Sequence, residues 1–291
     1  MNLTLFVQLL VNGIAMGMIY ALMAMGLILL IRAVGVMNFA QGELLMIGAF
    51  ITWALTNQLK LPAYAMIPAA MISFAIFGVI FMFTIYWPLR NASYPVATII
   101  ATMGASMAIK EIVILIWGSQ PLTARPIIKG ILKIGNVRLQ YQYLLTILVG
   151  GILIFLVFTL FEKLYAGRMM QAAAQDKYAA ELLGIPTILT TAATYIIVVS
   201  LASIGGFMIA PMFMVNVTLG SLQLRAFAGV VIGGFGNIKG AIIGSVLIGL
   251  VESYSSVITT TYKDAIVFLI LILMLLFRPQ GLFGDRIADK A

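Results

Sequence analysis

The chain offers few side chains that could do chemistry, and they are far apart. Its 291 residues include no histidine and no cysteine, which excludes serine–histidine triads, imidazole metal sites and histidine bases. The carboxylates that lie within or beside apolar stretches, Glu43, Glu111 and Glu252, are scattered and form no recognisable catalytic set. We therefore expect no enzyme active site, no cofactor and no metal ion.

The densest polar group lies at the head of an apolar stretch, VMNFAQGELLMIGAF, where Asn38, Gln41 and Glu43 fall within six residues. Unpaired polar groups are costly in lipid, so these side chains must face protein or water. Two interpretations stay open. Asn38 and Glu43 could simply cap a helix and favour the positive end of its dipole, or the group could gate a translocation path. Further candidates for such a path are Asn12, Thr102 and Asn216.

The composition indicates a membrane protein. Hydrophobic residues make up 63% of the chain and charged residues 9%, whereas soluble domains carry about 25% charged residues. The net charge of +8 is spread over the loops, which fits the orientation of spans better than a nucleic-acid surface. The apolar run from Leu3 to Ile31 has no basic residue before it and predicts a first span, not a cleaved signal peptide.

Long apolar segments predict an all-α polytopic fold. We expect a single transmembrane domain over residues 1–291 with eight to ten helices, some short or broken near 220–245. Spans are expected at 3–31, 36–58, 62–87, 95–117, 143–160, 187–210, 241–258 and 265–277, with a half-crossing or tilted hairpin at 222–232.

Closely spaced glycines predict tight helix packing, because small residues let two backbones approach each other. They are Gly13, Gly17, Gly229, Gly233, Gly236, Gly240 and Gly244. A glycine-rich loop could also hold phosphate. Here it lacks the Walker spacing and lies between membrane segments, so a nucleotide site is disfavoured.

Two polar stretches interrupt the apolar pattern. Residues 118–142 carry glycine, proline and alternating branched residues, which predict turns and a short hairpin. Residues 161–186 are rich in alanine and end in Gly184 and Pro186, which predicts a helix that stops there. This helix is too polar to cross a bilayer and has too little apolar surface to stand alone in water. It either lies at the membrane interface or docks on a soluble partner.

The second polar stretch resembles a known element. The string G-R-x-x-x-A-x-A-Q-D-x-x-x-A-x-L-L-G-I, from Gly167 to Ile185, is similar to the cytoplasmic coupling loop of LivH-type permeases of branched-chain amino acid ABC transporters. Three further strings resemble the same family in the right order. They are N-F-A-Q-G-E-x-x-M-x-G-A from Asn38, A-F-A-G-V-V-I-G-G-F-G-N-I-K-G-A-I-I-G from Ala226 and R-P-Q-G-L-F-G from Arg278.

The resemblance implies a permease subunit of an ABC importer in the bacterial inner membrane, moving branched-chain or other hydrophobic amino acids by alternating access. It further implies two separate cytoplasmic ATPase subunits, a second homologous permease subunit and an extracytoplasmic binding protein. The coupling loop would cover about 162–186, and an extracytoplasmic loop about 118–142. The residues implied in coupling are Gly167, Arg168, Gln171, Ala174, Gln175, Asp176, Leu183 and Gly184.

Two other functions stay open. One is a permease of the same family for urea, amides or other amino acids, because the sequence does not reveal the substrate. The other is an ion-coupled secondary transporter, which would place acidic residues at the bilayer midplane.

Overall fold

A computed structural model describes residues 3–89, 95–128 and 130–284. Within these ranges six helices are long and apolar enough to cross a membrane: α1 (Leu3–Val34), α3 with its continuation η2 and α4 (Ala63–Phe81, Met82–Tyr86, Trp87–Leu89), α5 (Pro95–Trp117), α6 (Tyr141–Lys163), α9 (Thr187–Ile209) and α11 (Ile238–Ile258). The all-α membrane fold is confirmed. The expected number of eight to ten spanning helices stays a prediction.

Shorter elements complete the fold. They are α2 (Gln41–Trp53), which continues as the π-helix η1 (Ala54–Gln58), the 3₁₀ turn η3 (Val217–Ser221), α10 (Leu222–Gly233) and α12 (Lys263–Phe277). The helices α7 (Tyr165–Gln175) and α8 (Lys177–Leu182) join α6 to α9.

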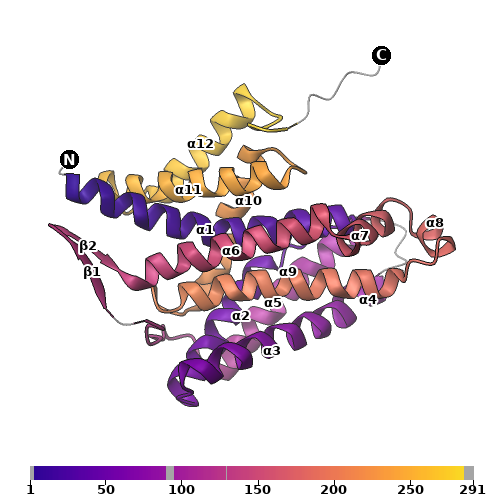
Figure 1. Cartoon of the computed structure of the whole chain (residues 1–291), viewed down its shortest axis with the longest axis horizontal. Coiled ribbons are helices and arrows are strands. Elements are labelled where there is room, and N and C mark those ends of the chain that lie inside the picture. The colour runs from indigo at the N-terminus through magenta and orange to yellow at the C-terminus, as the bar shows by residue number, and fades with distance from the viewer. Residues whose placement is uncertain (1–2, 90–94, 129, 285–291) are drawn as a thin grey trace.

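The two polar stretches lie at opposite ends of the molecule (Figure 1). One forms the predicted hairpin of β1 (Ile131–Ile134) and β2 (Val137–Gln140), in which Ile131 pairs with Gln140. The other forms α7 and α8. We call these two regions the hairpin end and the α7–α8 end. The N-terminal part of α1 belongs to the hairpin end, because Gln8 Nε2 donates to the Arg138 carbonyl at 3.2 Å.

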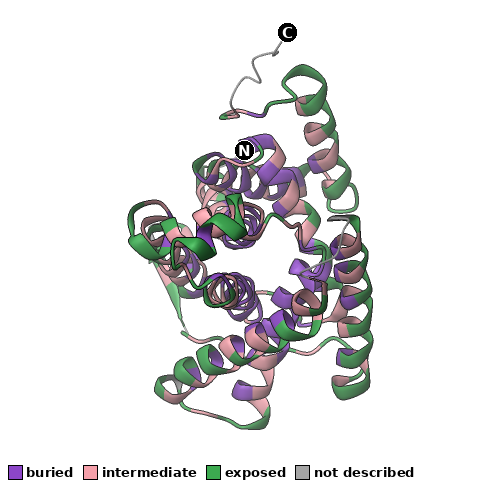
Figure 2. Cartoon of the chain, turned by 90° about the vertical axis from the view of Figure 1, so that its right-hand side faces the viewer, coloured by how far each residue is buried: buried purple, intermediate pink, exposed green. Residues whose placement is uncertain are grey.

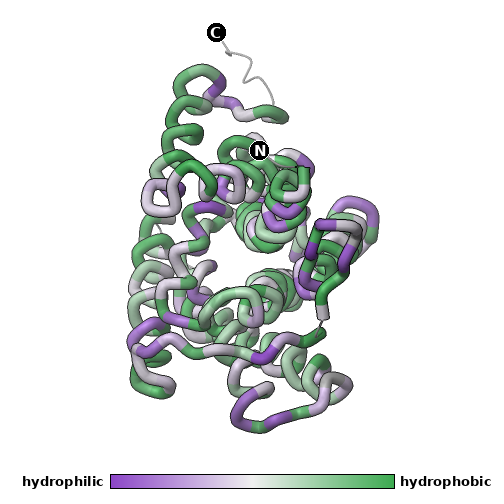
Figure 3. Tube along the Cα trace, turned by 90° about the vertical axis from the view of Figure 1, so that its left-hand side faces the viewer, coloured by the Kyte–Doolittle hydropathy of each residue, from purple (hydrophilic) through white to green (hydrophobic). Residues whose placement is uncertain are grey.

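The core is built around α1, which packs against α6, α9, α10 and α11. Its residues from Ile19 to Leu30 are almost completely buried. Figure 2 shows buried residues on the inward faces of the helices and exposed residues on the outer faces. Many of the outer residues are apolar, as the hydropathy colouring in Figure 3 shows. Outer faces of this kind fit a lipid environment, where a large apolar surface carries no penalty.

Glycines set the distance between α1, α10 and α11. A Cβ atom on Gly17 would lie 2.7 Å from the Val246 Cα, and one on Gly244 would lie 2.1 Å from the Gly229 carbonyl oxygen. Gly13, Gly229, Gly233 and Gly240 lie at similarly close backbone contacts. Gly236 differs: it lies in the turn before α11 with a φ of +88°, and nothing lies within 4 Å of its Cβ position. Its turn conformation, not helix packing, accounts for the glycine.

Two helices begin inside the molecule. α10 has 12 residues and is about 18 Å long, against about 30 Å for the apolar core of a bilayer. Its C-terminal Gly233 lies against Gly240 near the start of α11, so its N-terminus reaches only part of the way toward the hairpin end. α2 begins beside the C-terminal third of α1, about two turns before its end, since Gln41 lies against Gly26.

Replacing Gly244 with alanine tests the seam between α10 and α11. The added methyl group would collide with the Gly229 carbonyl, and overpacking of this kind costs about 1–3 kcal/mol. We expect a melting temperature of the purified protein in detergent lower by several degrees. Gly104→Ala is the control, because nothing lies within 4 Å of that Cβ position. Equal melting temperatures for the two variants would contradict the close contact.

Candidate functional site

The starts of α2 and α10 meet inside the protein and form a polar cluster, which we call the α2–α10 junction. It consists of Asn38, Gln41, Glu43, Thr102, Ser106 and Gln223. Gln223 joins the two helices: its Oε1 accepts from the Gly42 backbone N–H at 2.7 Å, and its Nε2 donates to the Asn38 carbonyl at 3.3 Å. The first N–H groups of a helix lack partners within the helix, so this side chain satisfies a backbone group that would otherwise be unpaired in an apolar interior.

The other members of the junction bind the segment that leads into α2. Asn38 Oδ1 accepts from the Ala40 N–H at 2.9 Å, and Thr102 Oγ1 accepts from the Phe39 N–H at 3.2 Å. Ser106 Oγ donates to Glu43 Oε1 at 3.2 Å. The expectation that Asn38 caps α2 is wrong: the N-cap is Ala40, which makes no side-chain cap bond, and Asn38 instead holds the turn before the helix. The role of these residues in a translocation path stays a prediction.

Two polar atoms of the junction remain unpaired. Gln41 Nε2 and Glu43 Oε2 are buried and have no hydrogen-bond partner among the described residues. Glycines make room for both side chains, since Cβ atoms on Gly26 and Gly220 would lie 2.5 Å from Gln41 Nε2 and Glu43 Oε1. An unsatisfied buried group costs about 1–3 kcal/mol. An unpaired donor and acceptor beside two helix N-termini could contact a small polar solute without binding it tightly.

Of the six path residues predicted from the sequence, the structure brings Asn38, Gln41, Glu43 and Thr102 together. Asn216 lies elsewhere, where its Oδ1 caps η3 by accepting from the Thr218 N–H at 3.0 Å. Asn12 is half-buried in α1, next to the place where Gly13 packs on α11.

The predicted coupling residues form a second feature, at the α7–α8 end. α7 packs tightly on the end of α6: a Cβ on Gly167 would lie 2.3 Å from the Leu160 carbonyl oxygen, and Gln171 Nε2 donates to the Phe161 carbonyl at 2.7 Å. Arg32 of α1 forms an ion pair with Glu162 beside this contact. Thr187 Oγ1, at the start of α9, donates to Glu181 Oε1 at 2.6 Å. The element is thus attached to α1, α6 and α9.

The expectation of one continuous helix from Arg168 to Leu183 is wrong. Asp176 adopts an extended conformation, ends α7 and caps α8, with its Oδ1 accepting from the Ala179 N–H at 2.9 Å. The predicted stop at Gly184 is confirmed. Its φ is +78°, and Ile185 N–H donates to the Ala180 carbonyl at 3.0 Å, as in a Schellman motif.

Most of the predicted coupling residues are open to solvent. Arg168, Gln175, Asp176, Leu183 and Gly184 are exposed, Gln171 and Ala174 are half-buried, and Gly167 is buried. Two further side chains, not predicted from the sequence, lie beside them. Tyr178 and Leu182 are 73% and 72% exposed, and Leu183 is 81% exposed. Together these three form an apolar patch on α8, and no spacing rule applied to a helix this short would have indicated it.

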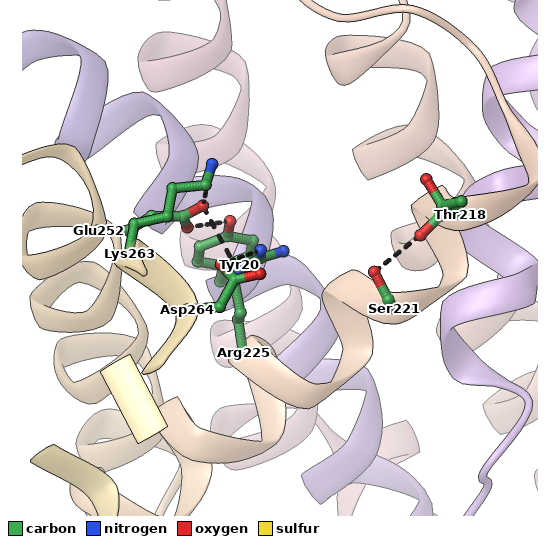
Figure 4. A network of polar contacts seen from close by, with 7 residues as sticks. All are labelled: Tyr20, Thr218, Ser221, Arg225, Glu252, Lys263 and Asp264. Carbon is green, nitrogen blue, oxygen red and sulfur yellow. Dashed lines mark hydrogen bonds and ion pairs between the residues drawn. The ribbon is translucent and has the colours of Figure 1, made fainter. Parts of the chain in front are cut away.

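A network of charged residues was also not predicted as a unit (Figure 4). Arg225 of α10 contacts Asp264 at 2.6 Å and Glu252 at 3.4 Å. Lys263 contacts Glu252 at 3.2 Å, and the Tyr20 hydroxyl donates to Glu252 at 2.5 Å. The available signal was Arg225, an arginine within an otherwise apolar segment, because charges at such positions usually have a partner or a function.

The six long apolar helices and their apolar outer faces define a multi-pass membrane protein. Residues 9–275 match the family described as "Branched-chain amino acid transport system / permease component", and the chain belongs to this family.

Its relatives cover nearly the whole chain. It is 30% identical to the high-affinity branched-chain amino acid transport system permease protein LivH of Salmonella typhimurium, over 98% of this chain and 97% of the relative. It is 30% identical to BraD of Pseudomonas aeruginosa, with 98% of both chains covered. A probable LivH of Methanocaldococcus jannaschii is 26% identical, over 90% of this chain and 88% of the relative.

Replacing Gln223 with leucine tests the α2–α10 junction. The variant keeps most of the side-chain volume but leaves the Gly42 N–H and the Asn38 carbonyl without this partner. We expect a loss of about 1–3 kcal/mol in stability, together with reduced transport. Leu224→Ala is the control, since Leu224 follows in the same helix and is 56% exposed. Wild-type stability and transport in Gln223→Leu would contradict the role of this side chain.

Proposed function

We propose that this chain is the permease subunit of an ABC importer that moves branched-chain amino acids across the inner membrane. Separate cytoplasmic ATPase subunits dock on α7 and α8 and drive alternating access. A second homologous permease subunit and an extracytoplasmic binding protein complete the transporter. The relatives are named branched-chain amino acid permease proteins, and they match this chain along almost their full length. We therefore assign the same substrate class to this chain.

The observation that carries this proposal is the construction of the α7–α8 end. Its inner side is fixed to α6 through Gly167 and Gln171 and to α9 through the Thr187–Glu181 hydrogen bond, and α7 also packs on α1. Its outer side presents the α8 patch of Tyr178, Leu182 and Leu183. Aromatic and aliphatic residues of this kind are typical anchors in protein–protein contacts. An element whose inner side is attached to the membrane helices and whose outer side carries an apolar patch is suited to receive force from a soluble partner.

The path we propose runs past the α2–α10 junction. Gly48 and Gly206 bring α2 and α9 into backbone contact, since a Cβ on Gly206 would lie 2.0 Å from the Leu45 carbonyl oxygen. A displacement of α9 at the α7–α8 end would therefore reach α2 and the junction. Few fixed charges and weak polar contacts suit brief passage of a hydrophobic zwitterion whose tight binding occurs on another protein.

Ion-coupled secondary transport is the second candidate, and Glu43 is the observation that favours it. This carboxylate lies in the interior of the domain, where ion-coupled carriers place acidic residues. Proteoliposomes separate the two functions. The importer requires ATP, the ATPase subunits and the binding protein for leucine uptake. An ion-coupled carrier would take up leucine with this chain alone when an ion gradient is imposed.

The double variant Leu182→Asp/Leu183→Asp tests the docking surface. Both side chains are largely exposed, so the folded permease should still insert in the membrane, while charges replace the apolar contact. We expect the ATPase subunits to be lost from the purified complex and ATP-driven uptake to fall to background.

Leu59→Asp is the matched control. Leu59 is 64% exposed and follows η1, in which Asn57 donates to the Thr123 carbonyl of the polar stretch that forms the hairpin end. This variant should retain the ATPase subunits. Retention of the ATPase subunits by the double variant at wild-type levels would contradict docking on α8.

A further inference from the structure

A polar cavity lies next to the α2–α10 junction, on its hairpin side. Its volume is about 450 Å³, and its polar lining comes from Asn216, Thr218, Ser221, Arg225, Glu252, Lys263 and Asp264. Tyr20, which binds Glu252, precedes Gly26 by six residues in α1 and so lies about 9 Å nearer the hairpin end. The first turn of α10 contributes to both sites: Gln223 belongs to the α2–α10 junction, and Arg225 lines the cavity.

The charges around this cavity balance. Two cations, Arg225 and Lys263, face two carboxylates, Glu252 and Asp264. The side chains of Arg225 and Glu252 are 11% and 10% exposed, whereas those of Lys263 and Asp264 are 34% and 52% exposed. The buried pair, Arg225 and Glu252, thus lies behind the more exposed pair, Lys263 and Asp264, which reaches the open side of the cavity.

The network leaves capacity for another ligand. Arg225 Nε is buried and faces Glu252 at 3.4 Å, so this capacity lies at the outer carboxylate, Asp264. The exposed carboxylate of Asp264 is bound through one oxygen by Arg225. Four charges in an apolar domain are costly, and apolar residues of similar size often stabilise a protein equally well or better. A purely structural contact between α10 and α12 therefore gives no reason for an open, charged cavity.

We infer that this cavity is an entry station for the zwitterionic head group of an amino acid. The α-carboxylate binds Arg225, and the α-ammonium group binds Asp264, so each charge of the ligand replaces one partner of the existing ion pair. Because the network is neutral, it accepts a neutral zwitterion without leaving an uncompensated charge, which an anion or a cation alone would do. This inference rests on the proposed function, and it adds the residues that recognise the substrate before it reaches the α2–α10 junction.

The chain has no cysteine, so a single introduced thiol can report on the cavity. Ser221→Cys places it in the cavity wall, on the same helical face as Arg225 four residues later. The assembled transporter is treated with a charged, membrane-impermeant thiol reagent, and labelling of this chain is followed by its mass. We expect L-leucine to slow labelling. 4-Methylpentanoate, which lacks the ammonium group, and 3-methylbutylamine, which lacks the carboxylate, should each have much less effect.

Two further variants assign the effect to the cavity. Asp264→Asn in the Ser221→Cys background is compared with its own labelling rate without leucine, and it should raise the leucine concentration needed for protection about tenfold, the value of one charge-assisted hydrogen bond. Asp264→Glu should restore protection, which a merely structural defect would not predict. Ser119→Cys, exposed in the loop that follows α5, should be labelled equally with and without leucine.

The outcomes separate this inference from the proposed function. Absence of protection by leucine, equal protection by 4-methylpentanoate, or full protection in Asp264→Asn would each overturn the entry station. ATP-driven leucine uptake by the unmodified transporter is measured in parallel. Absence of that uptake would overturn the proposed function, whereas uptake without protection would overturn only the assignment of this cavity.

Discussion

The structure depends on one constraint, which is that α2 begins among buried residues. The segment leading into α2 carries backbone polar groups into an apolar interior, and such groups need partners from the protein. Gln223, Asn38 and Thr102 supply them. α1 and η3 must then pack closely around the junction, which explains why Gly26 and Gly220 face it. The same groups that hold the helix starts make this the most polar part of the interior.

The second requirement is mechanical, because a permease without its own ATPase must receive force from outside. α7 and α8 are attached to α6 and α9 through backbone contacts and short hydrogen bonds, not through long flexible side chains alone. From α9 the contact continues to α2 by direct backbone packing at Gly48 and Gly206. We propose that this continuous packing links the docking surface to the α2–α10 junction. The charged cavity around Arg225 then lies one step further along the same path.

The sequence predicted the helices well because apolar segments of membrane length leave few alternatives. It also predicted the hairpin, whose turn requires Gly135 at a φ of +58°, and the stop at Gly184.

The sequence-based prediction failed where contacts between particular side chains determine the structure. The break at Asp176 depends on a local cap that competes with helix continuation, and alanine propensity favoured a single helix. The meeting of Gln223 with Asn38 joins residues far apart in the sequence, and neither spacing nor periodicity carries that information. The partners of Arg225 lie on two other helices, α11 and α12, so composition could indicate a costly charge but not the network around it.

We propose that the α2–α10 junction lines the path of the substrate, and the accessibility of an introduced cysteine from the two sides of the membrane tests this proposal. Gln223→Cys and, as a control, Ser245→Cys, which is completely buried between α10 and α11, are treated with an impermeant thiol reagent from either side of the membrane. The treatment is done without nucleotide and with ATP bound. The account predicts that the thiol at position 223 reacts from one side in one state and from the opposite side in the other, while the thiol at position 245 reacts in neither. A thiol at position 223 that stays unreactive from both sides in both states would contradict it.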